Sequence, residues 1–257
     1  MIRKYIIMIL VTFTSVSYGG FDDSFIWKNY LSRPENNSRS FLSSDGEIKL
    51  MFLHSNIYGI ESLNWNFVSM SYDKGILGFG MDVSAVGYKE YYQRNKYRWR
   101  IKYRPHNNIR IAPAIEILTE EFHNFGRHTG LSGEFYINYI QDKFNVGLGF
   151  TELQLIKPYD KSFNEALKPF VFGSWVFDEG LTLSIGIRRF ENKRTRWIFD
   201  QFVAVNDKLG LNFGYKNNPS DIYGGVDLTI NRFTFIITFS SVDGLRDSIV
   251  WGISFRG

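Results

Sequence analysis

The sequence predicts an all-β fold, namely a transmembrane antiparallel β-barrel of about 14 strands with both termini in the periplasm. Three observations predict it. Apolar residues alternate with polar or small ones in segment after segment, 18% of the residues are aromatic, and every second connection between segments is tight. Alternation directs one set of side chains toward lipid and the other toward the lumen, which is typical of bacterial outer-membrane barrels.

The first residues, "MIRKYIIMILVTFTSVSYGG", have the pattern of a secretory signal peptide. Arg3 and Lys4 precede an apolar run, and Ser17 and Gly19 stand where signal peptidase reads small side chains. The run is shorter than the roughly 20 residues of a spanning helix, so we expect cleavage after residue 19 rather than an anchor. The chain has no cysteine, which excludes a lipoprotein anchor and disulfides. We expect residues 20–46 to form a short segment that stays periplasmic or enters the lumen, and residues 47–257 to form the barrel.

The alternating segments define the strands. In "KLGLNFGYK" the residues Leu209, Leu211, Phe213 and Tyr215 share one face, while small or polar residues share the other. The segment "SIVWGISFRG" at the end of the chain alternates in the same way. Counting such segments predicts strands near residues 47–54, 62–73, 76–91, 95–104, 108–121, 129–141, 143–156, 167–177, 180–190, 195–205, 208–217, 221–230, 233–241 and 248–256. The apolar parity changes within "TELQLI" (151–156), which indicates a β-bulge or a stretch that rises above the bilayer.

The connections between these strands support the barrel independently. Tight connections such as "DKG" (73–75), "PHNN" (105–108) and "NR" (231–232) contain the Asp, Asn and Gly residues of hairpin turns. The connections between them are generally longer, as in "KPYDKSFNEAL" (157–167). Outer-membrane barrels have short periplasmic turns and longer outer loops, whereas a soluble β-sandwich has no reason to keep this order. We therefore expect the protein in the bacterial outer membrane.

The segment "KYRWRIKYRP" (96–105) is the leading candidate for a functional site. If its aromatic residues face lipid, its cations face the lumen, because a basic residue on the lipid face costs about 2–4 kcal/mol at mid-membrane. Such a basic ladder would contact anions or a ligand, as rings of basic residues do in anion pores. Its members are Arg98, Arg100, Lys102, Arg104 and, on the next strand, Arg110.

The alternative is a salt-bridged wall without selectivity. Asp82 and Glu90 have lumen parity and are able to pair with Arg104 and with Arg98 or Lys96, respectively. Glu116 and Glu134 lie on the following strands and add two more lumen carboxylates. Both interpretations of the ladder remain open from sequence alone.

Other kinds of site have little support. His54 and Ser55 are adjacent on a strand and point to opposite faces, whereas His54 and Asn56 share a face without a nucleophile beside them. Four histidines and no cysteine form no metal-binding pattern, and the glycines of "GILGFG" precede no helix, so we predict no enzyme, metal or cofactor. Basic residues lie on strand faces and in loops such as "ENKRTR" (191–196). Ordinary solvated loop charge is the simpler explanation, and lipopolysaccharide or outer-membrane lipid is a more natural partner than nucleic acid.

The closing stretch "LGLNFGYKNNPSDIYGGVDLTINRFTFIITFSSVDGLRDSIVWGISFRG" resembles the last hairpins of the PorV/PorQ-like proteins within the FadL-type outer-membrane barrels. A fainter likeness covers "HSNIYGIESLNWNFVSMSYDKGILGFGMDVSAVGYKE". The family's N-terminal "GMGGA…NPA" segment is not recognisable here. The resemblance implies transport of small or hydrophobic solutes across the outer membrane, or alternatively a secretion-associated barrel without transport that receives proteins of type IX secretion. The expected partners are accordingly a hydrophobic ligand or a secreted protein.

Overall fold

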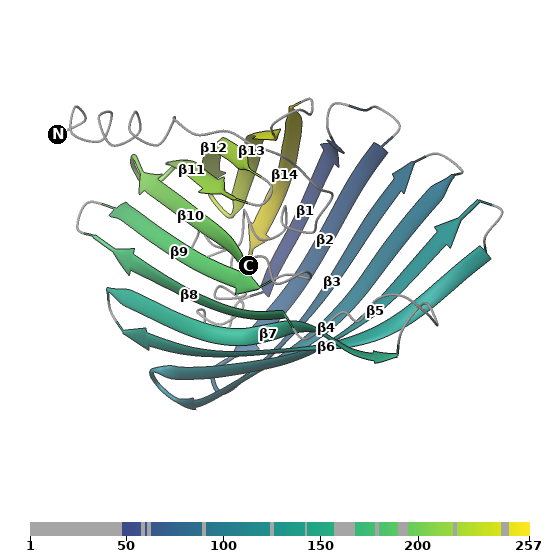
Figure 1. The fold of residues 1–257 in the computed structure, drawn as a ribbon. Helices are drawn as coiled ribbons and strands as arrows, with labels where there is room; N and C mark the ends of the chain where they lie inside the picture. The colour runs from purple at the N-terminus through teal and green to yellow at the C-terminus, as the bar shows by residue number, and fades with distance from the viewer. Residues whose placement is uncertain are drawn as a thin grey trace.

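The computed structural model contains fourteen strands, which form a closed antiparallel barrel (Figure 1). It describes residues 48–57, 60, 63–88, 91–123, 126–141, 143–156, 168–177, 180–189, 195–217, 220–242 and 247–257. The predicted signal peptide and the segment 20–46 therefore lie outside the described residues. The strands are β1 (Ile48–Asn56), β2 (Leu63–Lys74), β3 (Leu77–Tyr88), β4 (Tyr92–His106), β5 (Ile109–Phe122), β6 (Gly126–Gln141), β7 (Phe144–Ile156), β8 (Lys168–Val176), β9 (Leu181–Arg189), β10 (Thr195–Ala204), β11 (Leu209–Lys216), β12 (Asp221–Ile230), β13 (Phe233–Val242) and β14 (Ser248–Arg256).

The first and last strands close the ring. In Figure 1 the colour passes around the barrel from purple β1 to yellow β14, which lie next to each other. Lys49 pairs with Arg256 and Asn56 with Ile249, so β1 and β14 are antiparallel over their length. The predicted all-β barrel with about 14 strands is confirmed. The start of β1 and the end of β14 lie at the same end of the barrel, together with the tight turns.

The tight turns fall where the sequence places them. Gly75, in the β2–β3 turn, has a φ of 62°, and Asn231, between β12 and β13, has a φ of 55°. Such left-handed backbone is accessible to Gly and to Asn at low cost, which is why hairpin turns select these residues. We call this end of the barrel the turn end and the opposite one the loop end.

Two strands are longer than the sequence pattern predicts. β4 begins at Tyr92 rather than near 95, and β6 begins at Gly126 rather than near 129. Both extensions are at the loop end, where strands that rise above the lipid no longer need an apolar face. Polar residues such as Gln93 and Arg127 then continue the strand without showing alternation.

The parity change in "TELQLI" is a register irregularity within a continuous strand. β7 runs to Ile156, and its pairing with β6 shifts between Gly133 and Phe135 and again between Leu131 and Ser132. The register shift supports the β-bulge interpretation, because an extra residue turns the following side chains to the other face.

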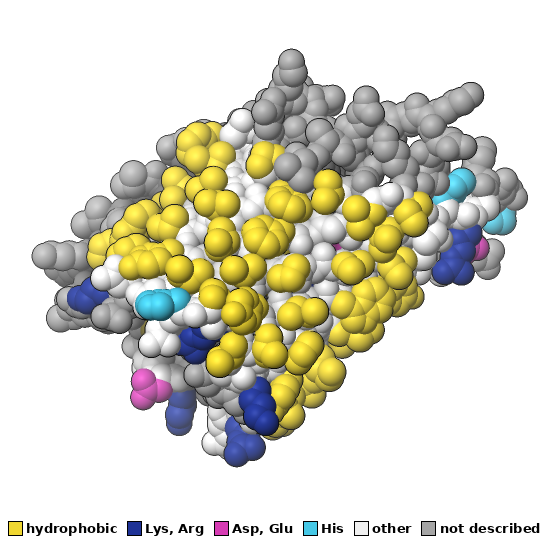
Figure 2. Space-filling view, turned by 90° about the horizontal axis from the view of Figure 1, so that it is seen from below, with side chains coloured by type: hydrophobic (Ala, Val, Ile, Leu, Met, Phe, Trp, Pro, Cys, Tyr) yellow, Lys and Arg dark blue, Asp and Glu magenta, His cyan; other side chains and the backbone are white. Residues whose placement is uncertain are grey.

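The outer face of the barrel is apolar. Figure 2 shows hydrophobic side chains spread across the visible face, with charged side chains mainly toward its two ends. Trp99, Phe79 and Trp251 are each about half exposed on this outer surface, in alternation with buried neighbours. No helix among the described residues is long and apolar enough to cross a membrane.

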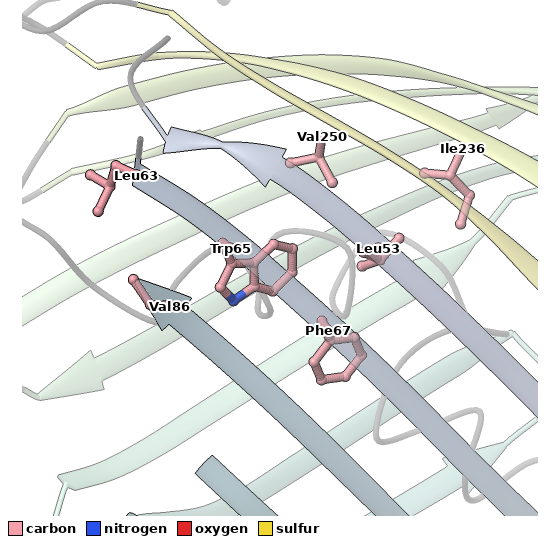
Figure 3. Packing of buried hydrophobic residues seen from close by; sticks show 7 residues of the cluster. All are labelled: Leu53, Leu63, Trp65, Phe67, Val86, Ile236 and Val250. Atoms are coloured by element: carbon pink, nitrogen blue, oxygen red, sulfur yellow. The ribbon is translucent and has the colours of Figure 1, made fainter. Parts of the chain in front are cut away.

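The inner face carries polar side chains and two apolar clusters. One, which we call the Trp65 cluster, spans the closure of the ring on β13, β14, β1, β2 and β3 (Figure 3). Its members are Leu53, Leu63, Trp65, Phe67, Val86, Ile236 and Val250. The other, the Phe170 cluster, joins β5, β6, β8 and β10 and consists of Ala112, Tyr136, Phe170, Phe172 and Ile198.

Candidate functional site: the inner wall of the barrel

Three β4 members of the basic ladder, Arg98, Arg100 and Lys102, have their side chains on the inner face. Arg100 and Lys102 are buried, whereas Trp99 and Ile101 between them are exposed on the outer face. Strand alternation produces this arrangement, because successive side chains point to opposite sides of the sheet.

Carboxylates on neighbouring strands contact these cations. Arg98 Nε donates to Asp82 Oδ2 at 2.9 Å, and Arg100 Nη2 donates to Asp82 Oδ1 at 2.6 Å. Arg98 also reaches Glu134 Oε2 at 3.2 Å across β5. Lys96 lies 3.7 Å from Glu116, and Lys102 forms an ion pair with Asp73.

The pairing of Asp82 differs from the one suggested by the sequence. Asp82 stands directly opposite Arg98 in the β3–β4 register, with Arg100 one inward position further along β4. Arg104 lies far from Asp82, beside the Gly75–Ile76 turn, where its backbone amide donates to the Ile76 carbonyl at 2.9 Å. The sequence pattern predicts one shared face for Arg98, Arg100 and Arg104, but Arg104 lies six positions along β4 from Arg98, the residue opposite Asp82. Glu90, the other suggested partner, lies outside the described residues.

The paired groups form a charge-balanced network. Tyr136 Oη donates to Glu134 Oε2 at 2.5 Å, and Ser69 Oγ donates to Asp82 Oδ1 at 2.7 Å. Four cations meet four carboxylates in this network: Lys96, Arg98, Arg100 and Lys102 with Asp73, Asp82, Glu116 and Glu134. These eight groups carry no net charge, which favours the salt-bridged wall over an anion filter. Arg110 is buried on the inner face of β5, opposite Asn138 of β6.

The Trp65 cluster offers a different kind of surface. Trp65 and Phe67 stack with their ring centroids 5.8 Å apart, and Trp65 Nε1 donates to Ser84 Oγ at 3.0 Å. Both side chains point inward from β2, next to Leu53 of β1 and Val250 of β14 (Figure 3). The inner wall is therefore apolar here, where a water-filled pore has polar side chains.

Three polar groups border the Trp65 cluster. Ser55 stands opposite both Trp65 and Val250, and Thr238 stands on the other side of Val250. Further along this row, Gly225 has no side chain, so Thr238 and Asn212 both approach the space above it. Among the described residues, Ser55 Oγ, Thr238 Oγ1 and Asn212 Nδ2 are buried without a hydrogen-bond partner. An apolar surface with a few convergent polar atoms is the usual composition of a small-molecule site.

Sequence reasoning did not single out the Trp65 cluster. Its residues come from five strands that are distant along the chain, and each alone is an ordinary inward residue. The available signal was the parity of Trp65 and Phe67 in "SLNWNFVSM", because they alternate with Asn64 and Asn66 on the outward face. In that segment the aromatic residues point inward and the asparagines outward, the reverse of β11, where Asn212 is buried on the inner face and Phe213 faces outward.

His54 lies on the outer face near the loop end and takes part in a polar cluster. Its Nδ1 lies 2.8 Å from Asn66 Oδ1, and its Nε2 lies 3.1 Å from Asn56 Oδ1. His54 and Asn56 thus share a face, as the sequence predicts. The described residues contain no group of three or more His, Asp or Glu side chains able to hold a metal ion.

Comparison with known proteins identifies the architecture. No family model and no curated protein sequence matches the chain. Among solved structures, a TodX deltaS2S3 mutant, described as a monoaromatic hydrocarbon channel, superposes with a TM-score of 0.66 at 10% identity, over 95% of this chain and 96% of that one. The chain has the fold of an outer-membrane β-barrel.

Two further structures agree with this result. CymD, also described as a monoaromatic hydrocarbon channel, gives a TM-score of 0.60 at 8% identity over 95% of this chain and 94% of that one. Omp33 of Acinetobacter baumannii gives 0.54 at 11% identity over 83% and 99%. The descriptions of these three proteins name two hydrocarbon channels and one outer-membrane protein, and none names an enzyme. The likeness shows that this chain shares the β-barrel fold of these outer-membrane proteins.

Proposed function

We propose that the barrel transports small apolar solutes across the outer membrane and that they contact the Trp65 cluster on the way. The observation that carries this proposal is the inward apolar surface of Leu53, Trp65, Phe67 and Val250. An apolar solute loses little free energy when it moves from the bilayer or a protein carrier to such a surface. A hydrated ion gains no free energy from contact with it. The names of TodX and CymD suggest aromatic hydrocarbons as the first solutes to test.

The test compares substitutions of nearly equal volume and opposite polarity. Leu53→Asn with Val250→Thr makes the cluster polar, while Ser55→Ala with Thr238→Val makes its border apolar. We expect uptake of radiolabelled toluene by cells with the barrel in their outer membrane to fall about fivefold in the first variant, because hydroxyl and amide groups must be desolvated. The second variant is the matched control and keeps or increases uptake.

The outcomes separate the proposal from its alternatives. Folding of each variant is checked by its heat-modifiable mobility in electrophoresis. Equal uptake by both variants would show that the width of the lumen alone governs the passage of toluene, and it would contradict the proposal. No uptake by the native barrel, with a secreted protein that co-purifies, would favour the secretion-associated role. The PorV/PorQ resemblance implies this role, which stays a prediction.

A further inference from the structure

Gln201 occupies an unusual position on the lipid-facing surface. On β10 the residues Arg196, Ile198 and Asp200 are buried on the inner face, and the strand pairs without a register shift with β9 and β11. Gln201 therefore points outward with Trp197 and Phe199. Trp197 is 47% exposed, as expected on this face, whereas Gln201 is only 3% exposed.

Aromatic and aliphatic side chains enclose Gln201. It lines a groove across β10, β11 and β12, together with Phe199, Phe213, Tyr215 and Ile222. The cavity volume of about 20 Å³ holds one small group and not a whole ligand. Among the described residues, Gln201 Nε2 has no hydrogen-bond partner. A buried donor beside an apolar groove within a membrane costs several kcal/mol unless something accepts from it.

The position of Gln201 within the membrane limits which chemical groups are able to accept a hydrogen bond from its amide. Trp197 lies four positions from Gln201 toward the loop end, and Val205 lies four positions from it toward the turn end. Both of these side chains are exposed on the outer face. With strands tilted by about 40°, this places Gln201 about 10 Å inside each end of the apolar belt on β10. Phosphate and sugar headgroups lie at the membrane surfaces and do not reach this depth, and water is scarce there.

We propose that this groove binds a small lipid-soluble molecule that carries one hydrogen-bond acceptor, such as an aromatic ketone. Its carbonyl oxygen enters the cavity and accepts from Gln201 Nε2, and its apolar part lies against Phe199, Phe213 and Tyr215 in the bilayer. The small cavity volume fits a carbonyl group, and the aromatic lining favours an aromatic body by edge and face contacts. This site is on the outer wall and is separate from the Trp65 cluster, so it goes beyond the proposed transport of solutes.

Benzophenone tests the proposal directly, because it is an aromatic ketone and a photolabel. The full barrel in lipid nanodiscs is irradiated with benzophenone, and labelled tryptic peptides are located by mass spectrometry. Cleavage after Arg196, Lys208 and Lys216 gives the peptides 197–208 and 209–216, which contain the groove residues of β10 and β11. We expect these two peptides to carry most of the outer-face label in the native barrel.

Two variants remove the donor while they keep the volume. In Gln201→Leu and Gln201→Met, labelling of both peptides falls about tenfold, because a hydrogen bond in an apolar medium is lost. Both variants still fold, since an apolar side chain suits this face. Val203→Leu, on the same outer face but outside the groove lining, is the control and leaves labelling unchanged. Acetophenone competes with the label better than ethylbenzene does in the native barrel, and the two compete equally in Gln201→Leu.

Three results would overturn the proposal. Equal labelling of the native barrel and Gln201→Leu would show that the amide binds nothing. Label spread evenly over outward-facing peptides would show partition into lipid alone. A stable dimer whose interface protects the peptides 197–208 and 209–216 would show that a second copy of the chain fills the groove. The Leu53→Asn, Val250→Thr variant should keep the labelling, which makes failure here distinguishable from failure of the transport proposal.

Discussion

Asp82 contacts three partners in the inner charge network. It accepts from Arg98 at 2.9 Å, from Arg100 at 2.6 Å and from Ser69 at 2.7 Å, and it is buried. Removal of such a buried carboxylate leaves the cations without an anion, even where the intact network adds little net stability.

Asp82→Asn should therefore destabilise the barrel by about 3–5 kcal/mol, because Arg98 and Arg100 lose a shared carboxylate in a buried setting. Urea unfolding of the barrel in lipid vesicles, followed by tryptophan fluorescence, measures this change. Glu120→Gln is the control. Its partner Arg94 is more exposed, at 29% of the side chain, so the loss should be below about 1 kcal/mol. Equal costs for the two variants would show that burial does not decide the role of Asp82.

The sequence could predict which residues point inward but not which of them touch. Parity along "KYRWRIKYRP" alone places Arg98, Arg100 and Lys102 on one face, because the side-chain period of a strand is two. Contacts depend on the register between strands, and a shift of two residues preserves parity while it replaces every partner. For that reason the suggested pairing of Asp82 with Arg104 was wrong.

At the scale of the strand, β7 shows why glycines recur on the inner face. The ring of Phe172 lies over Gly147, and the ring of Phe170 approaches Gly149. These two aromatic rings stack with centroids 6.0 Å apart and form the centre of the Phe170 cluster. Glycine at these positions leaves room for aromatic rings from the neighbouring strand to lie flat on the wall.

Gly147→Ala should cost about 1–3 kcal/mol of unfolding free energy, because the new methyl group would overlap Phe172 and Asn138. Gly87→Ala is the matched control. A methyl group there meets its nearest neighbour, the Tyr92 carbonyl oxygen, at 3.7 Å, which is an ordinary contact. Thermal unfolding of both variants in the same detergent gives the comparison. A Gly147→Ala barrel as stable as Gly87→Ala would show that Phe172 moves aside freely.

Strand number could be predicted from sequence because lipid imposes a strict alternation on each crossing. Strand ends could not be predicted as well, since the constraint disappears outside the membrane. β4 and β6 show the difference, for both continue past the last alternating residue at the loop end. The Trp65 cluster was also beyond reach, because it assembles only when β14 meets β1.

At the scale of the whole barrel, the balanced charges of the inner network predict its ion selectivity. Any ion current through the native barrel should show no preference for anions. Replacing Arg98, Arg100 and Lys102 with glutamine leaves the carboxylates of the network in excess, so the current should shift toward cations. Reversal potentials in a planar bilayer under a potassium chloride gradient measure this shift.

The control for this experiment is the double variant Arg94→Gln, Glu120→Gln, which removes one ion pair without changing net charge. It should leave the reversal potential where the native barrel has it. Anion selectivity in the native barrel, lost in the triple variant, would instead restore the basic ladder as a filter.

The pairing of β1 with β14 also determines when the protein becomes a membrane protein. Lys49 and Arg256 are partners although 207 positions separate them along the chain. Until that pair forms, apolar residues alternate with polar ones along each strand, and no closed apolar surface surrounds the sheet. The barrel strands therefore present a continuous apolar surface to lipid only as the ring forms. A sheet whose ends are so distant in sequence is expected to fold slowly and to expose unpaired strand edges until the ring closes.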